Sequence, residues 1–176
     1  MEIVGQIFSI IGMALTVVSF QMKTKKQILV IQTVGSAFFL ASYVLFASWA
    51  AVCLNIVFLI RNTVFYFKDK KWASHGIWLY LILTLVIAAG ALGFNTYWDI
   101  VPIIGSIFGT VAAYMKNENM FRLLKLGDSP CWLIYNASIP SIGGIICEAI
   151  NIVSILVGLI RYRKYGFSKT ERIPEK

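Results

Sequence analysis

Long apolar stretches, separated by short polar segments, run through most of this chain. They predict seven helices, at about residues 3–20, 27–46, 48–67, 76–94, 99–115, 129–142 and 144–161. A helix needs about 20 residues to cross the ~30 Å hydrocarbon core of a bilayer, and most of these stretches have close to that length. The pattern therefore predicts an all-α polytopic membrane protein with seven transmembrane helices.

Two of these boundaries divide apolar runs that are too long for one span. Residues 27–67 would form a helix of ~60 Å at 1.5 Å per residue, so we expect the chain to reverse near Ala47–Ser48–Trp49. Residues 129–161 are also too long, and we expect their reversal at Gly143–Gly144, after Pro140.

The sixth helix is expected to begin at Asp128–Ser129–Pro130, which has a capping side chain and a proline in the first turn. Just before it, residues 120–126 are expected to form a short amphipathic turn on the cytoplasmic surface. The sequence thus predicts a break between this turn and the helix.

Lysine and arginine residues follow every second apolar stretch, and the gaps between carry none. Fifteen of the sixteen lie in four clusters, at residues 23–26, 68–71, 116–125 and 161–176. Basic loops are retained in the cytoplasm, so we expect the N-terminus outside and the tail of residues 162–176 in the cytoplasm. The net charge of +8 therefore lies on one side, which favours attraction to anionic lipid over nucleic-acid binding.

The composition excludes several classes of protein. At 176 residues and 59% hydrophobic content, with a mean hydropathy of +0.77, the chain has no room for a separate soluble domain. Cys53, Cys131 and Cys147 share no metal or redox spacing and are expected to be free thiols, and His75 is the only histidine. No phosphate-binding loop or hydrolase motif is present. We expect no cofactor, no metal and no enzymatic activity. The expected partners are the lipid bilayer, a small polar solute and further copies of the chain in a homo-oligomer.

Short sequence identities recur in the two halves of the chain. Ile10–Ile11–Gly12 recurs 93 positions later, and Asn55–Ile56–Val57 recurs 96 positions later, where Asn151 takes the place of Asn55. The second offset also places Phe39 opposite Tyr135. Because these identities share one order along the chain, they indicate an internal repeat.

The repeat divides the chain into three parts. Residues 1–67 and 99–161 are two copies of a three-helix unit with the same orientation, and the helix at 76–94 links them. Parallel repeats related by an axis along the membrane normal are typical of transporters.

Several motifs are distributed along the chain up to its tail. They are Gln21-x-Lys23-x-Lys25-Lys26 with Gln32, Asn55-x5-Arg61–Asn62, Trp132–Leu133–Ile134–Tyr135–Asn136 before Ser141-x-Gly143, and then Glu148, Ser154, Gly158 and Arg161. In these motifs the chain resembles the YgjV-type bacterial inner-membrane proteins. The resemblance implies a multi-pass protein of the bacterial inner membrane and implies no particular substrate.

The layout of three, one and three helices more distantly resembles the SWEET sugar carriers, the PQ-loop proteins and the nicotinamide riboside carriers. The resemblance to SWEET-like proteins implies that Asn55 and Asn151, on the third helix of each repeat, bind a solute. It implies that Phe39 and Tyr135, on the second helices, line the same site. The chain departs from the PQ-loop pattern at Phe20, where those proteins have proline, which argues against a mechanism built on proline hinges.

Two charged residues lie inside the predicted spans. Glu148 is the only carboxylate well within one, where a charge is costly. It either binds the solute or a coupling proton, or it bonds to a neighbouring helix as a structural carboxyl group. Arg61 is expected to snorkel to the cytoplasmic face. Its predicted depth differs from that of Glu148 by ~10 Å, a long reach for an ion pair.

These features favour a carrier for a small polar solute. Its site would lie between the two repeats and contain Asn55, Asn151, Phe39, Tyr135 and Glu148. The alternative is a membrane receptor or interaction scaffold that keeps this fold without moving a solute. A continuous polar path between the repeats favours the carrier, whereas a dry, packed interface with an exposed lateral groove favours the scaffold.

Reporter fusions test the predicted orientation. A fluorescent protein fused after Lys176 should mature in the cytoplasm, and alkaline phosphatase inserted near Asn95–Thr96 should be active outside, because the basic loops are retained in the cytoplasm. Both positions on the same side of the membrane would contradict the count of seven spans.

Overall fold

The computed structural model describes residues 2–19, 25–68, 70–115 and 118–162, and every regular element in these ranges is helical. The elements are α1 (Glu2–Ser19), α2 (Lys25–Leu45), α3 (Trp49–Tyr66), α4 (Ile77–Leu92), a short 3-10 helix η1 (Tyr97–Asp99), α5 (Ile100–Tyr114), α6 (Glu118–Ser138) and α7 (Ile142–Tyr162). The predicted all-α fold with seven long helices is confirmed.

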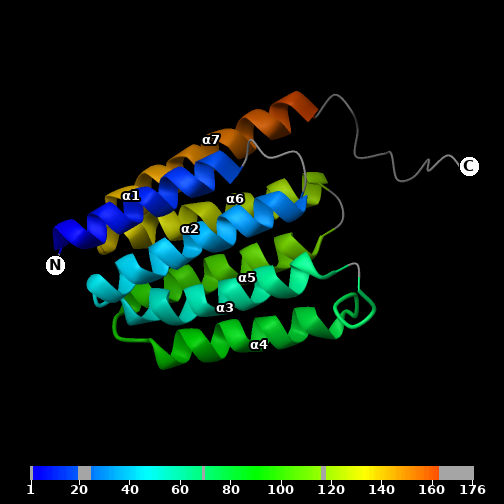
Figure 1. The fold of residues 1–176 in the computed structure, drawn as a ribbon, viewed down its shortest axis with the longest axis horizontal. Coiled ribbons are helices and arrows are strands. Elements are labelled where there is room, and N and C mark those ends of the chain that lie inside the picture. Colours follow the sequence, from blue (N-terminus) through cyan, green and yellow to red (C-terminus); the bar gives the residue numbers. More distant parts are fainter. Residues whose placement is uncertain (1, 20–24, 69, 116–117, 163–176) are drawn as a thin grey trace, which may run out of the picture.

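The predicted reversal after the second helix is also confirmed. The chain turns at residues 46–48, and Ala47 adopts a φ of 53°, in the left-handed region that residues with a side chain seldom occupy. This tight turn places α2 and α3 side by side and antiparallel (Figure 1).

The predicted start of α6 is wrong. The helix begins at Glu118, ten residues before Asp128, and Pro130 lies inside it. Residues 120–126 are therefore part of the same helix and not a separate surface turn. A proline removes one backbone hydrogen bond, but Gly105 and Gly109 of α5 allow α6 to pack closely at this point, where added side-chain carbons would meet Cys131 and Asp128.

The reversal before α7 also differs from the prediction. The chain turns at residues 139–141, and Gly143 and Gly144 lie in the first turn of α7. Both glycines permit close packing instead. A side-chain carbon at Gly143 would collide with the backbone of Ser9, and one at Gly144 would collide with the Asn136 amide.

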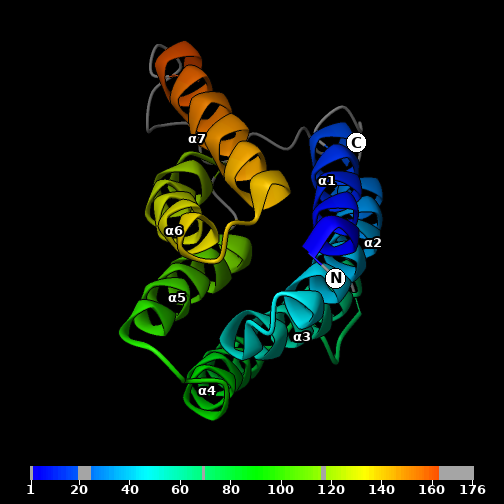
Figure 2. The ribbon, with the colours of Figure 1, turned by 90° about the vertical axis from the view of Figure 1, so that its left-hand side faces the viewer.

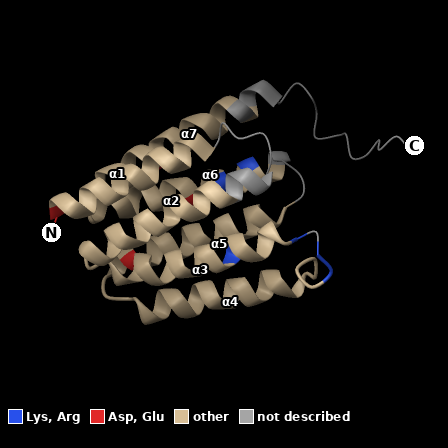
Figure 3. Cartoon of the chain, viewed as in Figure 1, with Lys and Arg blue, Asp and Glu red and all other residues tan. Residues whose placement is uncertain are grey.

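The seven helices form a closed ring in chain order. Each helix packs against the next, and α7 packs against α1 to close the ring; α3 also contacts α5 (Figure 2). We call the end of the bundle with the turns at 46–48, 93–99 and 139–141 the outer end, following the predicted orientation, and the opposite end the inner end. Lysine and arginine residues lie toward the inner end (Figure 3).

Side-chain contacts hold the closure between α1 and α7. The Gln6 side chain donates from Nε2 to the carbonyl of Pro140 at 2.5 Å and accepts at Oε1 from the N–H of Ile142 at 3.0 Å. The N–H of Gly143 donates to Ser9 Oγ at 3.2 Å. These bonds satisfy backbone groups at the start of α7, which a helix cannot pair internally.

The ring has an apolar outside and a partly polar inside. Large apolar side chains are exposed on all seven helices, among them Ile7, Val34, Ile60, Leu85, Phe108, Ile134 and Val153. Polar residues are buried, including Ser36, Asn55, Arg61, Thr110, Asp128 and Asn136. This distribution is expected when hydrocarbon surrounds the protein.

Three segments of the described chain are long and apolar enough to cross a membrane, namely Glu2–Ser19, Trp49–Tyr66 and Tyr97–Tyr114. Shorter apolar segments lie in α2, α4 and α7, at Val30–Leu45, Ile77–Leu92 and Ile142–Val157. The helix α6 has no such segment among the described residues, because its first half carries charged side chains. Seven complete crossings therefore remain a prediction.

Candidate solute-binding site

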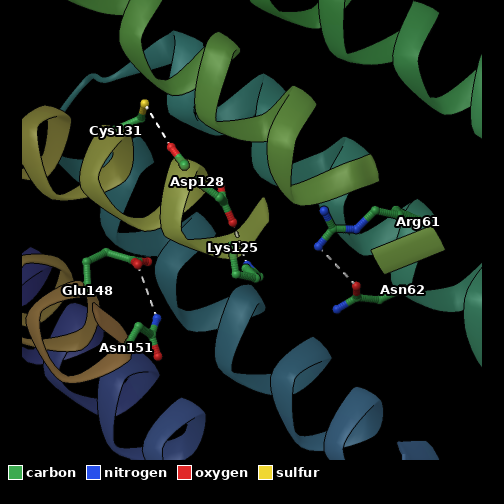
Figure 4. A network of polar contacts seen from close by, with 8 residues as sticks. Arg61, Asn62, Lys125, Asp128, Cys131, Glu148 and Asn151 are labelled. Carbon is green, nitrogen blue, oxygen red and sulfur yellow. Dashed lines mark hydrogen bonds and ion pairs between the residues drawn. The ribbon is translucent and has the colours of Figure 1, made fainter. Parts of the chain in front are cut away.

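Four charged side chains from three helices meet in the interior of the ring. Arg61 comes from α3, Lys125 and Asp128 from α6, and Glu148 from α7 (Figure 4). We call these four residues the interior charge cluster. Their formal charges sum to zero, which limits the cost of removing them from water.

The Lys125–Asp128 pair is the one closed ion pair of the cluster. Lys125 Nζ lies 2.5 Å from Asp128 Oδ2, and the two residues are one turn apart on α6. Asp128 is ten residues from each end of the helix, or about 15 Å at 1.5 Å per residue. Gly109 of α5 makes room for its carboxylate, since a side-chain carbon there would lie 2.7 Å from Asp128 Oδ2.

Arg61 is buried, so the expectation that it snorkels to the cytoplasmic face is wrong. Only 6% of the residue is exposed, and its guanidinium carbon lies 4.2 Å from the centre of the Phe58 ring. Its Nη2 donates to Asn62 Oδ1 over a long 3.5 Å, and its Nε has no hydrogen-bond partner. No carboxylate of the described residues lies within 4.0 Å of it.

Glu148 lies on the opposite side of the Lys125–Asp128 pair from Arg61 (Figure 4). Its Oε2 accepts a hydrogen bond from Asn151 Nδ2, one turn further along α7, at 3.1 Å. No cation of the described residues is within 4.0 Å of it.

Several buried polar atoms on these helices have no hydrogen-bond partner. They are Asn55 Oδ1, Arg61 Nε, Asn62 Nδ2, Ser129 Oγ and Asn151 Oδ1. Each such atom costs about 1–3 kcal/mol if it stays unpaired. Because native proteins pair most buried polar groups, these free donors and acceptors mark the interior faces of these helices as the candidate site for a polar ligand.

Aromatic residues fill the interior nearer the outer end. The Phe39 ring stacks with Tyr43 at 6.0 Å, Tyr43 with Trp132 at 6.2 Å, and Trp132 meets Tyr135 edge to face at 6.1 Å. We call these four residues the aromatic cluster. The Tyr43 hydroxyl donates to Asn136 Oδ1 at 3.2 Å, so α2 and α6 meet across the ring.

The five predicted site residues therefore fall into two groups. Phe39 and Tyr135 belong to one buried apolar core in the aromatic cluster. Glu148 and Asn151 are hydrogen-bonded to each other at the interior charge cluster. Asn55, on α3, is 9% exposed and shares with Asn151 an amide oxygen without a partner. No hydrogen bond joins the two amides among the described residues, and whether they face each other stays a prediction.

The prediction from sequence did not include Lys125, Asp128, Asn62 or Ser129. The cluster of basic residues at 116–125 predicts a cytoplasmic loop for Lys125, and Asp128–Ser129–Pro130 predicts a helix start for Asp128 and Ser129. One signal was available: Lys125, Asp128, Trp132 and Tyr135 recur at intervals of three and four residues, which places them on one face of a continuous helix.

Removing Lys125 tests whether the ion pair balances a buried charge. Lys125→Met should lower the free energy of unfolding by about 1–3 kcal/mol, because Asp128 is left without its cation. Adding Asp128→Asn should restore part of this loss, since it removes the unpaired charge. Thermal unfolding in detergent measures both, with the exposed Lys71→Met as the control. A double variant less stable than Lys125→Met alone would contradict this role.

Comparison with known proteins identifies a family. No curated protein and no solved structure matches the chain. The family model Imp-YgjV, described as a bacterial inner membrane protein, matches residues 3–165. This range includes nearly all of the seven helices and confirms the resemblance seen in the sequence motifs. The chain therefore belongs to the YgjV family of bacterial inner membrane proteins.

Proposed function

We propose that this inner-membrane protein is a carrier for a small polar solute, which binds inside the helix ring at the interior charge cluster and undergoes no chemical change. The observation that carries this proposal is the set of buried polar atoms without partners beside Arg61 and Glu148, two charges that no close ion pair neutralises. A purely structural bundle would be expected to pair them. A bound solute with its own donors and acceptors would satisfy them.

The packing of the helices supports a site between two repeats. If α1–α3 and α5–α7 are equivalent units, the contact of α1 with α7 has the contact of α5 with α3 as its counterpart, and both occur. Gly12 packs on Gly35, and the positions 93 and 96 residues later, Gly105 and Cys131, also pack on each other. A pseudo-twofold axis through the ring interior would relate these contacts.

The position of the aromatic cluster supports access from the inner end in this conformation. Its stacked rings fill the interior on the outer side of Arg61 and Asp128, at the level of Glu148, and the bond from Tyr43 to Asn136 ties α2 to α6 there. Opening the outer side would require α2 and α6 to separate at these contacts. Access from the cytoplasm assumes that the chain crosses the membrane seven times and that its C-terminus is cytoplasmic. Both assumptions are part of the proposal.

One observation favours the alternative of a receptor or scaffold. A groove of about 230 Å³ lies between α2 and α3 on the outside of the ring. Its lining residues are Val30, Thr33, Val34, Asn62, Thr63 and Tyr66. Such a lateral groove could hold a partner helix. The carrier remains the better account, because a partner in this groove would leave Ser129 Oγ and Asn151 Oδ1, on α6 and α7, without partners.

Substitution of the two repeat-related amides tests the carrier. The detergent-purified protein would be screened by thermal shift against sugars, nucleosides and amino acids. A ligand at 100 times its Kd stabilises by about 2.7 kcal/mol, a shift of several degrees. Asn55→Ala and Asn151→Ala should each abolish the shift while leaving most of the protein folded, because both amide oxygens are unpaired in the ligand-free protein and Asn151→Ala removes only one bond, that to Glu148 Oε2.

Asn136→Ala is the matched control for these variants. Its amide is already paired, with Tyr43 and with the carbonyl of Trp132, so its loss should lower the melting temperature but keep the response to solute. A shift retained in both Asn55→Ala and Asn151→Ala would exclude the proposed site. If no compound of any class shifts the wild-type protein, the carrier function itself is contradicted.

A further inference from the structure

The interior charge cluster has a donor pole and an acceptor pole. We propose that the solute is a zwitterion, whose anionic group binds Arg61 and Asn62 and whose cationic group binds Glu148 and Asn151. This inference rests on the carrier function proposed above and specifies the chemical class of its solute.

Two charges of the cluster, those of Arg61 and Glu148, lie outside its closed ion pair. Lys125 and Asp128 neutralise each other at 2.5 Å. Arg61 and Glu148 remain, one cation and one anion, each without an oppositely charged group within 4.0 Å among the described residues. They project into the interior from opposite sides of the Lys125–Asp128 pair (Figure 4). A molecule that contacts both residues alongside this pair would meet both signs of charge.

The α3 side of the cluster offers donors. Arg61 Nε and Asn62 Nδ2 are buried and have no partner, and the two residues are linked by the bond from Arg61 Nη2 to Asn62 Oδ1. The Phe58 ring covers a face of the guanidinium, which leaves its edge as the binding surface. Guanidinium edges bind carboxylates and phosphates with two parallel hydrogen bonds. The donor pole therefore fits an anionic group.

The α7 side of the cluster offers acceptors. The carboxylate of Glu148 accepts one bond from Asn151 Nδ2, while Asn151 Oδ1 has no partner. A carboxylate and an amide oxygen one helical turn apart can accept two of the three hydrogen bonds of an ammonium group. Ser129 Oγ on α6, also without a partner, can either donate or accept. The acceptor pole therefore fits a primary or substituted ammonium.

Other classes of solute fit the two poles less well. A neutral sugar would leave both Arg61 and Glu148 without an opposite charge within 4.0 Å in a poorly solvated interior. A simple anion would leave Glu148 unbalanced, and a simple cation would leave Arg61 unbalanced. Because an uncompensated buried charge is costly, a molecule with both charges balances the cluster best.

A series of ligands that differ by one charge tests this inference on the full chain in detergent. The zwitterions would be glycine, L-alanine, β-alanine and γ-aminobutyrate, which differ in the spacing of their charges. Propionate lacks the ammonium group, ethylamine lacks the carboxylate, and glucose and uridine carry neither. At least one zwitterion should bind, and analogues lacking either charge should bind at least roughly tenfold more weakly, equivalent to about 1.4 kcal/mol.

Two variants give a readout that a merely structural role would not change. Glu148→Gln should weaken the binding of the zwitterion and reduce its advantage over propionate, while keeping its advantage over ethylamine. Arg61→Gln should also weaken the binding of the zwitterion, but it should reduce the advantage over ethylamine and keep the advantage over propionate. If either variant does not fold, Glu148→Asp or Arg61→Lys retains the charge but changes its reach, and should weaken zwitterion binding more than glucose binding. The ligand series on the unaltered chain tests the inference independently of all four variants.

A zwitterion can also be the headgroup of a lipid, and the groove beside Asn62 opens toward the membrane. Binding of short-chain phosphatidylethanolamine more tightly than all four amino acids would identify a lipid as the source of the zwitterion. Short-chain phosphatidylglycerol, which lacks the ammonium group, is the control and should bind more weakly. If glucose or uridine binds as tightly as every zwitterion and Arg61→Gln has no effect, the inference is wrong while the carrier function stands. If no ligand of any class binds, both are contradicted.

Discussion

Charge balance inside the ring is the constraint on which the rest of this structure depends. Hydrocarbon outside the bundle cannot solvate a charge, so every charge that faces inward must find compensation within the protein. Lys125 and Asp128 achieve this directly at 2.5 Å, and Gly109 provides the space for the carboxylate. Arg61 and Glu148 have no opposite charge within 4.0 Å among the described residues and are balanced only across the cluster.

The shape of the ring follows from how closely the helices can approach. Gly143 lets α7 cross the backbone of α1, and Gly105 lets α5 approach α6. At the outer end, Gln6 and Ser9 bind the turn that leads into α7. These contacts close the ring around the aromatic cluster on one side and the interior charge cluster on the other.

Much of the fold could be predicted from the sequence, because helix limits and turns are set by local patterns. Runs of apolar residues defined the spans, and the reversal at Ala47 came from length alone. Local signals failed at α6, where Asp128–Ser129–Pro130 reads as a helix start. There the contact with α5 and the burial of Asp128 outweigh the missing hydrogen bond at Pro130. Tertiary packing overrides local propensity in this way wherever a close contact compensates.

The candidate site was less predictable for a related reason. Glu148 could be identified because a carboxylate in an apolar span is costly wherever it points. Lys125 and Asp128 lie in a polar stretch that matches a cytoplasmic loop, so nothing local distinguished them from surface charges. The spacing of Phe58 and Arg61 does predict that they are neighbours on one helix, but which face of α3 turns into the ring depends on the other helices, so the burial of Arg61 was not predictable.

The central claim, that the interior charge cluster is open to solutes from one side and not a sealed network, is tested most directly by thiol labelling. Single Ser129→Cys and Ser42→Cys variants would be prepared with Cys53, Cys131 and Cys147 replaced by alanine. Both serines are buried without hydrogen-bond partners, but Ser42 lies near the outer end of α2. A small, charged methanethiosulfonate should modify the thiol at position 129 and spare the one at position 42. Equal protection of both thiols would contradict an accessible polar site.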